Sequence, residues 1–492
     1  MATGSVSFDQ VSSNIRVPGF YGEVSNSAAG YYSQNLVALI IGQPTTAGLS
    51  VVPELVTTPE AATERYGAGS MLARMISAFR KNNEDTELWA VPLTDAAGTA
   101  ATHTMTITGT ASAAGTIFLY IGGELIQVPV ASSDTATAIG DAVVSTVNAN
   151  VLLPCTAANA SGVVTFTAKN KGTIGNLINY QVNFRSELGG EKLPAGISVV
   201  FAVDEAGATD PTLATATAAL GDLDFEYIIH PYTDTTSLNT MRDFLSLRWS
   251  PNKMLYGHSF TAAQGTSSQL YTLGDNRNDE HQTIFGAYGS PTWSPEIAAG
   301  AGGVAAKYLN IDPARTLQTL PVVNVVVPKK SNWFTQSELN TLLFNGITPL
   351  NYTGGVARIV RCITTYQVNS YGMADPSYLD VTTMSTNSAI MRECKTMILQ
   401  KFPRSKLAAD DTAFGVGQAI VTPKIIRGEL IALYDDFIFR GLVQNKGDFV
   451  EKLIVTLSPT DPNRVDVLLP PTLINNLVVT ALRNEFKLRI GN

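Results

Sequence analysis

The sequence predicts an α/β core, in which helices flank a mixed sheet, with an inserted mostly-β domain and extended N- and C-terminal strand arms. Three observations predict this fold class. Strand and helix patterns alternate before residue 96 and again after residue 201. Between these positions the composition shifts to Thr, Ala, Ser, Gly and Val, which favours short strands and turns. Near both termini, apolar and polar residues alternate with a period of two, as in half-buried strands.

The length of 492 residues allows two to four domains with substantial cores. We expect an N-terminal linker arm at residues 1–24 and a discontinuous α/β domain at 25–95 and 202–320. An inserted, mostly-β outer domain is expected at 96–201, because an exposed loop of a host domain tolerates insertions. Residues 321–492 are expected to form a C-terminal domain that ends in donated strands.

The first predicted unit is a strand, a helical region and a second strand. The apolar run at residues 36–41 predicts a strand buried on both faces. Thr58-Pro59 predicts the start of one helix, and Ser70 caps the next. Residues 88–91 return to a strand, so this βαβ unit implies a parallel sheet.

The inserted region is predicted to contain a hairpin of residues 116–121 and 124–130, turned at Gly122-Gly123, then a helix over 136–150 and a strand over 163–168. After residue 201, predicted strands and helices alternate again. Later predicted strands are 225–230, 253–258, 282–287, 322–327 and 356–365, and later predicted helices are 238–249, 294–309, one capped by Ser385 and the longest, which opens at Thr422-Pro423. Residues 453–490 are predicted to form three closing strands.

The two ends of the chain carry the candidate functional residues. The apolar positions of these predicted strands are Val6, Phe8, Ile15 and Val17 in the first arm and Val478, Leu482, Phe486 and Leu488 in the last. A strand needs a hydrogen-bonding neighbour, and a terminal strand can find one in another chain. The sequence therefore predicts a homopolymer whose copies exchange terminal strands.

Composition excludes several functional classes. The net charge of −8 and pI near 5.2 argue against a nucleic-acid partner, which needs clustered Lys and Arg. The sequence shows neither an export signal nor an apolar run of about 18 residues, so we expect no membrane insertion. Three widely spaced cysteines predict no disulfide framework and a reducing cytoplasm as the place of synthesis.

No residue pattern predicts catalysis, and we expect no cofactor, no metal and no enzyme. The glycine cluster at residues 300–303 lies inside a predicted helix, so close helix packing is the better interpretation than a phosphate loop. His258, Asp275, Asp279 and His281 offer metal-binding atoms, but their spacing matches no ligand pattern. We interpret them as loop and capping residues.

Several motifs resemble the contractile tail sheath proteins of tailed bacteriophages, most closely those of Mu-like phages. They are DPARTLQTL at 312–320, RIVRCITTY at 358–366, DPSYLDV at 375–381 and TDPNRV at 460–465, with YGAGSML at 66–72 and the helix around 298–300 upstream. Each motif is short, and their order and spacing make the similarity specific. It covers most of the chain outside the insertion.

The resemblance implies a structural subunit of the virion, assembled in the host cytoplasm. It implies stacked, hexameric rings around a tail tube protein, with baseplate and tail terminator proteins as further partners. It further implies that contraction drives the tube through the host envelope for DNA delivery. By analogy, the helix that opens at Thr422 and the turn after it contact the tube, through Asp435, Asp436, Arg440, Lys446 and Asp448.

Two alternatives remain open from the sequence. The first is the sheath of a contractile bacteriocin or a type VI-like secretion machine, which only neighbouring genes would separate from a phage sheath. The second is a cytosolic α/β enzyme with a β accessory domain, which predicts a pocket with converging titratable groups.

Overall fold

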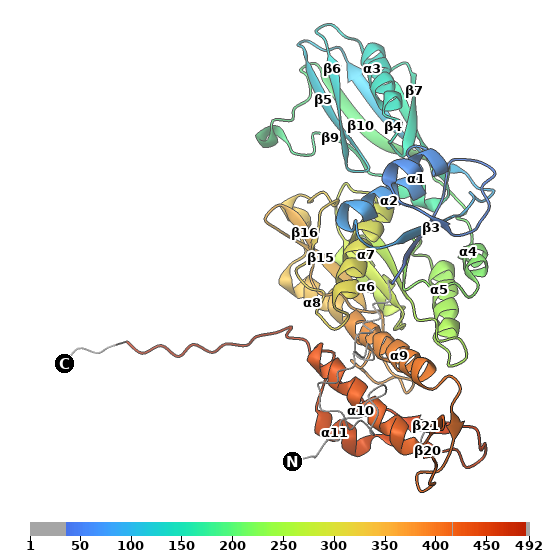
Figure 1. Ribbon diagram of the computed structural model, residues 1–492. Coiled ribbons are helices and arrows are strands. Elements are labelled where there is room, and N and C mark those ends of the chain that lie inside the picture. Colours follow the sequence, from blue (N-terminus) through green and yellow to red (C-terminus); the bar gives the residue numbers. More distant parts are fainter. Residues whose placement is uncertain (1–35, 416, 489–492) are drawn as a thin grey trace, which may run out of the picture. The chain divides into compact units, whose positions relative to one another are not determined.

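A nine-stranded mixed sheet forms the centre of the computed structural model, which describes residues 36–415 and 417–488 (Figure 1). The strands, in their order across the sheet, are β14 (Pro321–Val322), β16 (Val356–Ile359), β15 (Ile347–Thr353), β13 (Gln282–Ala287), β12 (His258–Gln264), β11 (Tyr227–Ile229), β1 (Ala38–Gly42), β3 (Leu88–Pro92) and β2 (Glu54–Leu55). The pairs from β15 through β13, β12, β11 and β1 to β3 are parallel. The two edges of the sheet, formed by β16 with β14 and by β2, are antiparallel.

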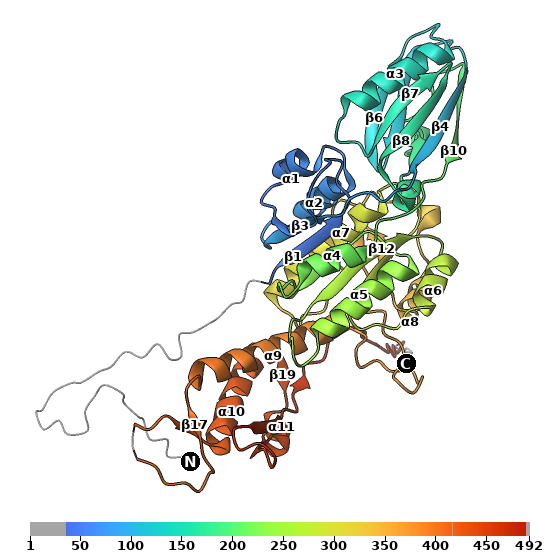
Figure 2. The same cartoon turned by 90° about the vertical axis from the view of Figure 1, so that its right-hand side faces the viewer.

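Helices cover both faces of this sheet. They are α1 (Pro59–Tyr66), α2 (Met71–Asn82), α4 (Leu213–Leu220), α5 (Thr235–Arg248), α6 (Ser267–Asp275), α7 (Ser294–Ile311) and α8 (Gln336–Phe344). The helices α2 and α7 lie on one face, and α4, α5 and α6 lie on the other (Figure 2). Thr58 and Ser70 cap α1 and α2 through their side-chain oxygens, as predicted.

The glycines of α7 allow close packing against the sheet and against α2. A Cβ atom on Gly302 would lie 2.9 Å from Cγ1 of Ile229, and one on Gly303 would lie 3.1 Å from a ring carbon of Phe79. One on Gly300 would lie 1.9 Å from the side-chain oxygen of Asn324. The interpretation of this cluster as a packing feature is therefore confirmed.

The region after β3 forms two small sheets and a helix. Its elements are β4 (Ala100–Gly109), β5 (Gly115–Ile121), β6 (Glu124–Val130), α3 (Ala136–Ala149), β7 (Cys155–Ala160), β8 (Val163–Lys171), β9 (Tyr180–Val182) and β10 (Ile197–Glu205). The sheets have the orders β10-β4-β8-β7 and β6-β5-β9. The predicted boundary at residue 201 falls inside β10, which continues to Glu205, and Thr99 then bridges to Ala208.

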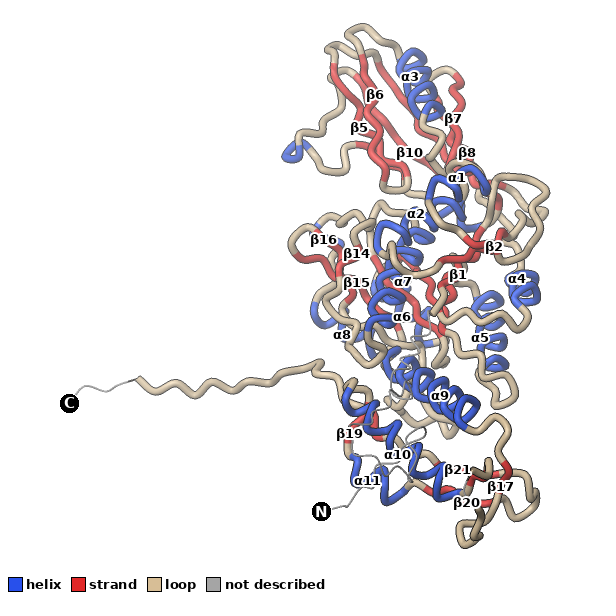
Figure 3. Tube along the Cα trace, in the orientation of Figure 1, coloured by secondary structure: helices blue, strands red, loops and turns tan. Residues whose placement is uncertain are grey.

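The remaining chain builds a second hydrophobic cluster. Its elements are α9 (Val381–Lys401), β17 (Lys406–Leu407), β18 (Ile420–Val421), α10 (Pro423–Phe439), β19 (Val443–Gln444), α11 (Lys446–Lys452), β20 (Ile454–Leu457), β21 (Val465–Leu468) and β22 (Thr472–Leu473) (Figure 3). Leu430 and Tyr434 of α10 are buried in this cluster with Ile390 of α9 and Phe449 of α11. Thr422 caps α10, as predicted.

Several predicted elements need correction. The strand predicted over 253–258 begins only at His258, and the β-branched runs 322–327 and 356–365 form strands only at Pro321–Val322 and Val356–Ile359. The reason is that a strand requires a neighbour, which these runs have over only a few residues. The helix α9 begins at Val381 after Asp380, so Ser385 lies inside it. Residues 445–448 are not a simple turn, because α11 begins at Lys446.

Strands β14, β15 and β16 belong to the central sheet, so the predicted domain boundary between residues 320 and 321 falls at the first strand of that edge. Val322, Leu350 and Ile359 are part of the central hydrophobic cluster. No helix in the described ranges has the length and hydropathy needed to cross a membrane.

Candidate functional site

The last described segment of the chain, residues 474–488, contains neither helix nor strand. The last of the three predicted closing strands, at residues 478–490, is therefore not formed in its described part, residues 478–488. The exposed fractions of its apolar side chains are 87% for Leu482, 75% for Phe486 and 80% for Leu488, while Val478 is partly covered. Large apolar side chains exposed in a row are a feature of interaction sites. Val6, Phe8, Ile15 and Val17 lie outside the described residues.

The hairpin β20–β21 is a two-stranded sheet whose outer edges have no strand neighbour in the described part of the chain. The strands pair from Ile454 with Leu468 to Leu457 with Val465. Ile454 is 50% exposed and Leu468 is 57% exposed. An isolated two-stranded sheet is marginally stable, and its free N–H and C=O groups accept further strands. The sequence predicted this hairpin as strands but did not indicate that its edges are open.

A row of small and apolar residues faces outward on α10. Ile425 is 38% exposed and Phe439 is 86% exposed, with the exposed residues Gly428 and Ala432 between them. These positions repeat at intervals of three, four and seven residues, so they share one helix face. A Cβ atom built on Gly428 has no neighbour within 4 Å. Sequence reasoning missed this face, although the spacing of Ile425, Ala432 and Phe439 would have indicated it.

The charged residues predicted to contact the tube are engaged with their own subunit. Lys446 lies 2.6 Å from Asp435. Arg440 bridges Asp436 of α10, at 3.1 Å, and Glu393 of α9, at 2.7 Å. The remaining pair joins Asp448 to Lys452 across one turn of α11, at 2.6 Å. All five predicted residues are thus brought to one region around α10 and α11, as partly exposed ion pairs.

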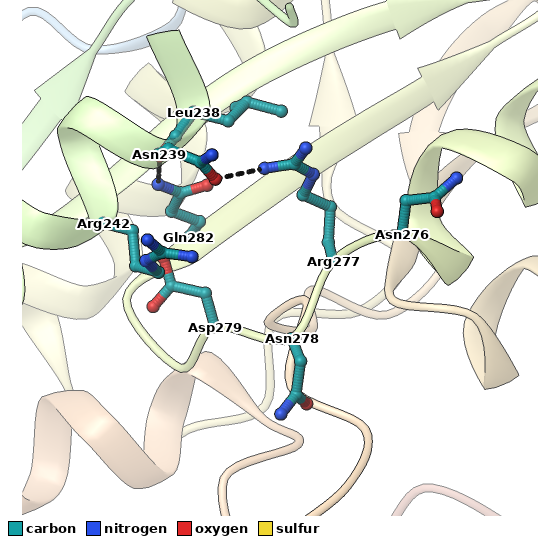
Figure 4. A pocket seen from close by; sticks show the side chains of 8 residues that line it. All are labelled: Leu238, Asn239, Arg242, Asn276, Arg277, Asn278, Asp279 and Gln282. Carbon is teal, nitrogen blue, oxygen red and sulfur yellow. Dashed lines mark hydrogen bonds between the residues drawn. The ribbon is translucent and has the colours of Figure 1, made fainter. Parts of the chain in front are cut away.

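A small polar cavity lies where α5 meets the loop between α6 and β13 (Figure 4). Its volume is about 50 Å³, well below the 300–1,000 Å³ typical of ligand pockets. Arg277 donates to Asn239 across it at 2.9 Å, and Gln282 donates to the Leu238 carbonyl at 2.6 Å. Burial raises the pKa of Asp279 to about 7. A wider depression beside it, of about 620 Å³, is lined by Thr235, Gln269, Thr272, Leu273, Asn276 and Arg277.

The residues considered as metal ligands do not converge. His258 hydrogen-bonds Thr283 at 2.8 Å, and the ring of His281 stacks on Trp249. Asp279 accepts from the His281 amide at 2.9 Å. Across residues 36–415 and 417–488, no three His, Cys, Asp or Glu side chains are grouped as metal ligands. Burial raises the pKa of the Cys155 thiol to about 11, which disfavours the reactive thiolate.

Three sequence-family models match successive parts of the chain. They describe the phage tail sheath protein beta-sandwich domain at residues 96–198, the phage tail sheath protein central domain at 206–365 and the phage tail sheath C-terminal domain at 373–487. The Mu-like prophage FluMu tail sheath protein of Haemophilus influenzae is 36% identical over 488 residues, which are 98% of this chain and 99% of that protein. The chain belongs to the phage tail sheath protein family. This sheath protein is a non-enzymatic, structural component of the virion tail, as the motifs predicted.

Solved sheath proteins are similar at low sequence identity. The sheath tail protein of Desulfitobacterium hafniense is 12% identical, with a TM-score of 0.49, and the comparison covers 94% of this chain and 97% of that one. The sheath tail protein of Listeria innocua is 9% identical, with a TM-score of 0.49 and coverage of 90% and 92%. The predicted fold class, a mixed α/β core with an inserted mostly-β domain, is confirmed for this sheath protein, and the inserted domain matches the beta-sandwich model.

Proposed function

We propose that this protein polymerises into a contractile tail sheath by strand exchange, in which the C-terminal segment of one copy pairs with the β20–β21 hairpin of another. The observation that carries the proposal is the exposure of Leu482, Phe486 and Leu488 on a segment that has no strand partner among residues 36–415 and 417–488. The hairpin offers matching open edges and exposed apolar side chains. Adding a strand satisfies main-chain groups on both partners and buries these side chains.

Contraction, in this proposal, needs no nucleotide. The strand connections hold neighbouring subunits together while the rings move, and the contracted lattice buries more mutual surface than the extended one. At about 25 cal/mol per Å², a few hundred Å² of additional apolar contact contributes several kcal/mol per subunit. Summed over the stacked, hexameric rings, this free energy drives the tube through the host envelope. Baseplate and tail terminator proteins would control the start and the length of the sheath.

Deletion of residues 477–492 tests the strand exchange. The truncated subunit should remain folded, because the removed residues contribute little to either hydrophobic cluster. It should not form tubular sheaths in electron micrographs. A matched control replaces only the charged residues Arg483, Glu485 and Lys487 by Ser, which keeps the backbone and the apolar face and should still allow assembly. Normal sheaths from the truncated chain would contradict the proposal.

We propose that the outward face of α10, from Ile425 through Gly428 and Ala432 to Phe439, contacts the tail tube protein. A Cβ atom on Gly428, within this face, would meet no described atom within 4 Å, and the ion pairs of Asp435, Asp436 and Arg440 adjoin the face. A helix face with small residues between two large apolar ones lets another surface approach closely.

The replacement Gly428→Leu tests this contact. Leu adds a side chain to open space and suits a helix better than Gly, so the subunit should be at least as stable. In the absence of tube protein, the variant should form sheaths normally. In the presence of purified tubes, it should fail to form sheaths around them. Ser145→Leu, on the exposed side of α3, is the matched control and should leave both processes unchanged. Normal assembly of Gly428→Leu around the tube would place the contact elsewhere.

The alternative of a bacteriocin or secretion sheath shares the same geometry. Neighbouring genes for capsid and terminase proteins would favour a phage, and their absence would favour one of the other machines.

A further inference from the structure

We infer that Gln318 and Asn476 act as positioning residues that set the direction in which the C-terminal segment leaves the subunit. This inference rests on the proposed strand exchange. Gln318 donates from Nε2 to the Leu477 carbonyl at 3.2 Å, and Asn476 donates from Nδ2 to Oγ1 of Thr382 at 2.9 Å. These two hydrogen bonds are the last that join the segment to the rest of the described chain. Residues 479–488, which follow them, are all exposed.

The two bonds join the segment to a different part of the molecule from the one that precedes it. Just before them, β22 pairs with β19, and Ile474 donates to the Leu442 carbonyl at 3.1 Å, inside the second hydrophobic cluster. Gln318 instead follows Leu317, which is buried in the central cluster. The chain therefore crosses from one cluster to the other at residues 474–477 and is exposed from residue 479 to residue 488.

The residues that receive the segment are held rigidly. The Cys362 amide donates to the Leu317 carbonyl at 2.9 Å, and the Thr319 amide donates to the Ile359 carbonyl at 2.7 Å, so Gln318 is fixed on both sides. Thr319 has a φ of +60°, a costly conformation for a β-branched residue. Such strain persists only where the surroundings enforce it, and here it turns the chain next to Gln318.

Thr382 is equally fixed. It lies in the first turn of α9, two residues after Asp380, which pairs with Arg361 through two contacts of 2.8 Å. Its side chain is 4% exposed. When the start of the C-terminal segment is fixed, the segment has a high effective concentration near one neighbouring hairpin. A segment that pivots freely samples many directions, so its effective concentration there is lower. The bonds therefore contribute to assembly more than to the fold.

The double variant Gln318→Glu and Thr382→Val tests the inference. Glu keeps the shape of Gln but cannot donate to the Leu477 carbonyl, and Val keeps the shape of Thr without its hydroxyl group. The subunit should stay folded, amide exchange at residues 474–478 should accelerate, and the concentration needed for sheath assembly should rise about tenfold. The single variant Gln318→Lys keeps Thr382 and can still donate to the Leu477 carbonyl. It should therefore assemble at a lower concentration than the double variant.

Gln264→Glu is the matched control, since Gln264 also donates to a main-chain carbonyl, that of Thr292, at 2.6 Å. It should lower stability without changing the assembly concentration of the remaining folded protein. Assembly of the double variant at wild-type concentration would overturn the inference, provided that deletion of residues 477–492 still abolishes assembly. If that deletion assembles normally, the strand exchange itself fails and this inference fails with it.

Discussion

At the scale of single residues, the buried pair of Arg392 and Glu226 joins α9 to the chain just before β11. Glu226 is 5% exposed, contacts the Arg392 guanidinium directly and accepts from Ser388 at 3.1 Å. Burial raises the pKa of the Glu226 carboxyl, while the charge of Arg392 lowers it. The guanidinium also donates to the Tyr256 carbonyl at 3.0 Å. Groups from three sequence-distant parts of the chain thus depend on one another.

Replacing Arg392 by Ala should be strongly destabilising, because it leaves a buried carboxylate without its partner. We expect a loss of about 3–5 kcal/mol in the free energy of unfolding, measured by urea denaturation. The double replacement Glu226→Met and Arg392→Leu should recover much of it. Arg464→Ala, which breaks an exposed pair with Asp466, is the control and should change stability little. Equal losses for both arginines would contradict this account.

At the scale of elements, the inserted sandwich is anchored by specific bonds rather than tethered by two linkers. Arg74 of α2 pairs with Glu296 of α7 at 2.6 Å and donates to the Leu152 carbonyl at 2.7 Å. The indole of Trp293 donates to the Ile174 carbonyl at 3.0 Å. We propose that the insertion is one domain whose end lies near residue 208, beyond the boundary expected from composition.

Excision of residues 99–208 should leave a folded core that still forms sheaths. Its melting temperature should fall by several degrees, because Trp293 and Arg74 lose partners. Excision of residues 96–201 should lower the melting temperature further, since it leaves the last residues of β10 without their partner β4. Thermal denaturation and electron microscopy of the two deletions check this. An unfolded product from the first deletion would show that the core needs the sandwich.

At the scale of the whole molecule, buried ionisable groups make stability depend on pH. Burial lowers the pKa of His230 to about 4, that of His258 to about 3 and that of His281 to about 4. Below pH 6.5 the unfolded chain therefore binds protons that the folded chain refuses, so these groups reduce stability as pH falls toward 4. Asp279 has the opposite effect on stability. Because its pKa is raised, the folded chain holds a proton that the unfolded chain releases, so this group increases stability as pH falls. Burial also lowers the pKa of His103 and raises the pKa values of Glu226 and Glu296, so four histidines act against three carboxyl groups.

Stability should therefore decline between pH 6.5 and about 4, with each histidine contributing up to about 1.4 kcal/mol per pH unit. His258→Gln should flatten this slope by nearly one proton, because Gln does not titrate and can bond Thr283. Urea denaturation at pH 7, 6 and 5 measures the slope for both proteins. An identical slope in the variant would mean that His258 is not the neutral, buried group described.

Local features were predictable from the sequence because they depend on residues close together in the chain. The caps at Thr58, Ser70 and Thr422 and the hairpin across Gly122-Gly123 belong to this class. The pairing of Asp435 with Lys446 was not predicted, since it depends on how α11 packs beside α10. The spacing of Ile425, Ala432 and Phe439 indicates an apolar helix face, but only the fold shows that this face points outward.

The sequence by itself determined most of the helices and strands, the α/β class and, through its motifs, the sheath family. Only the tertiary structure decided that, within the described part of the chain, residues 474–488 have no strand partner and the β20–β21 edges are open. The physical reason is that an alternating pattern specifies which side chains a strand would bury, whereas the strand itself exists only where another backbone supplies its hydrogen bonds.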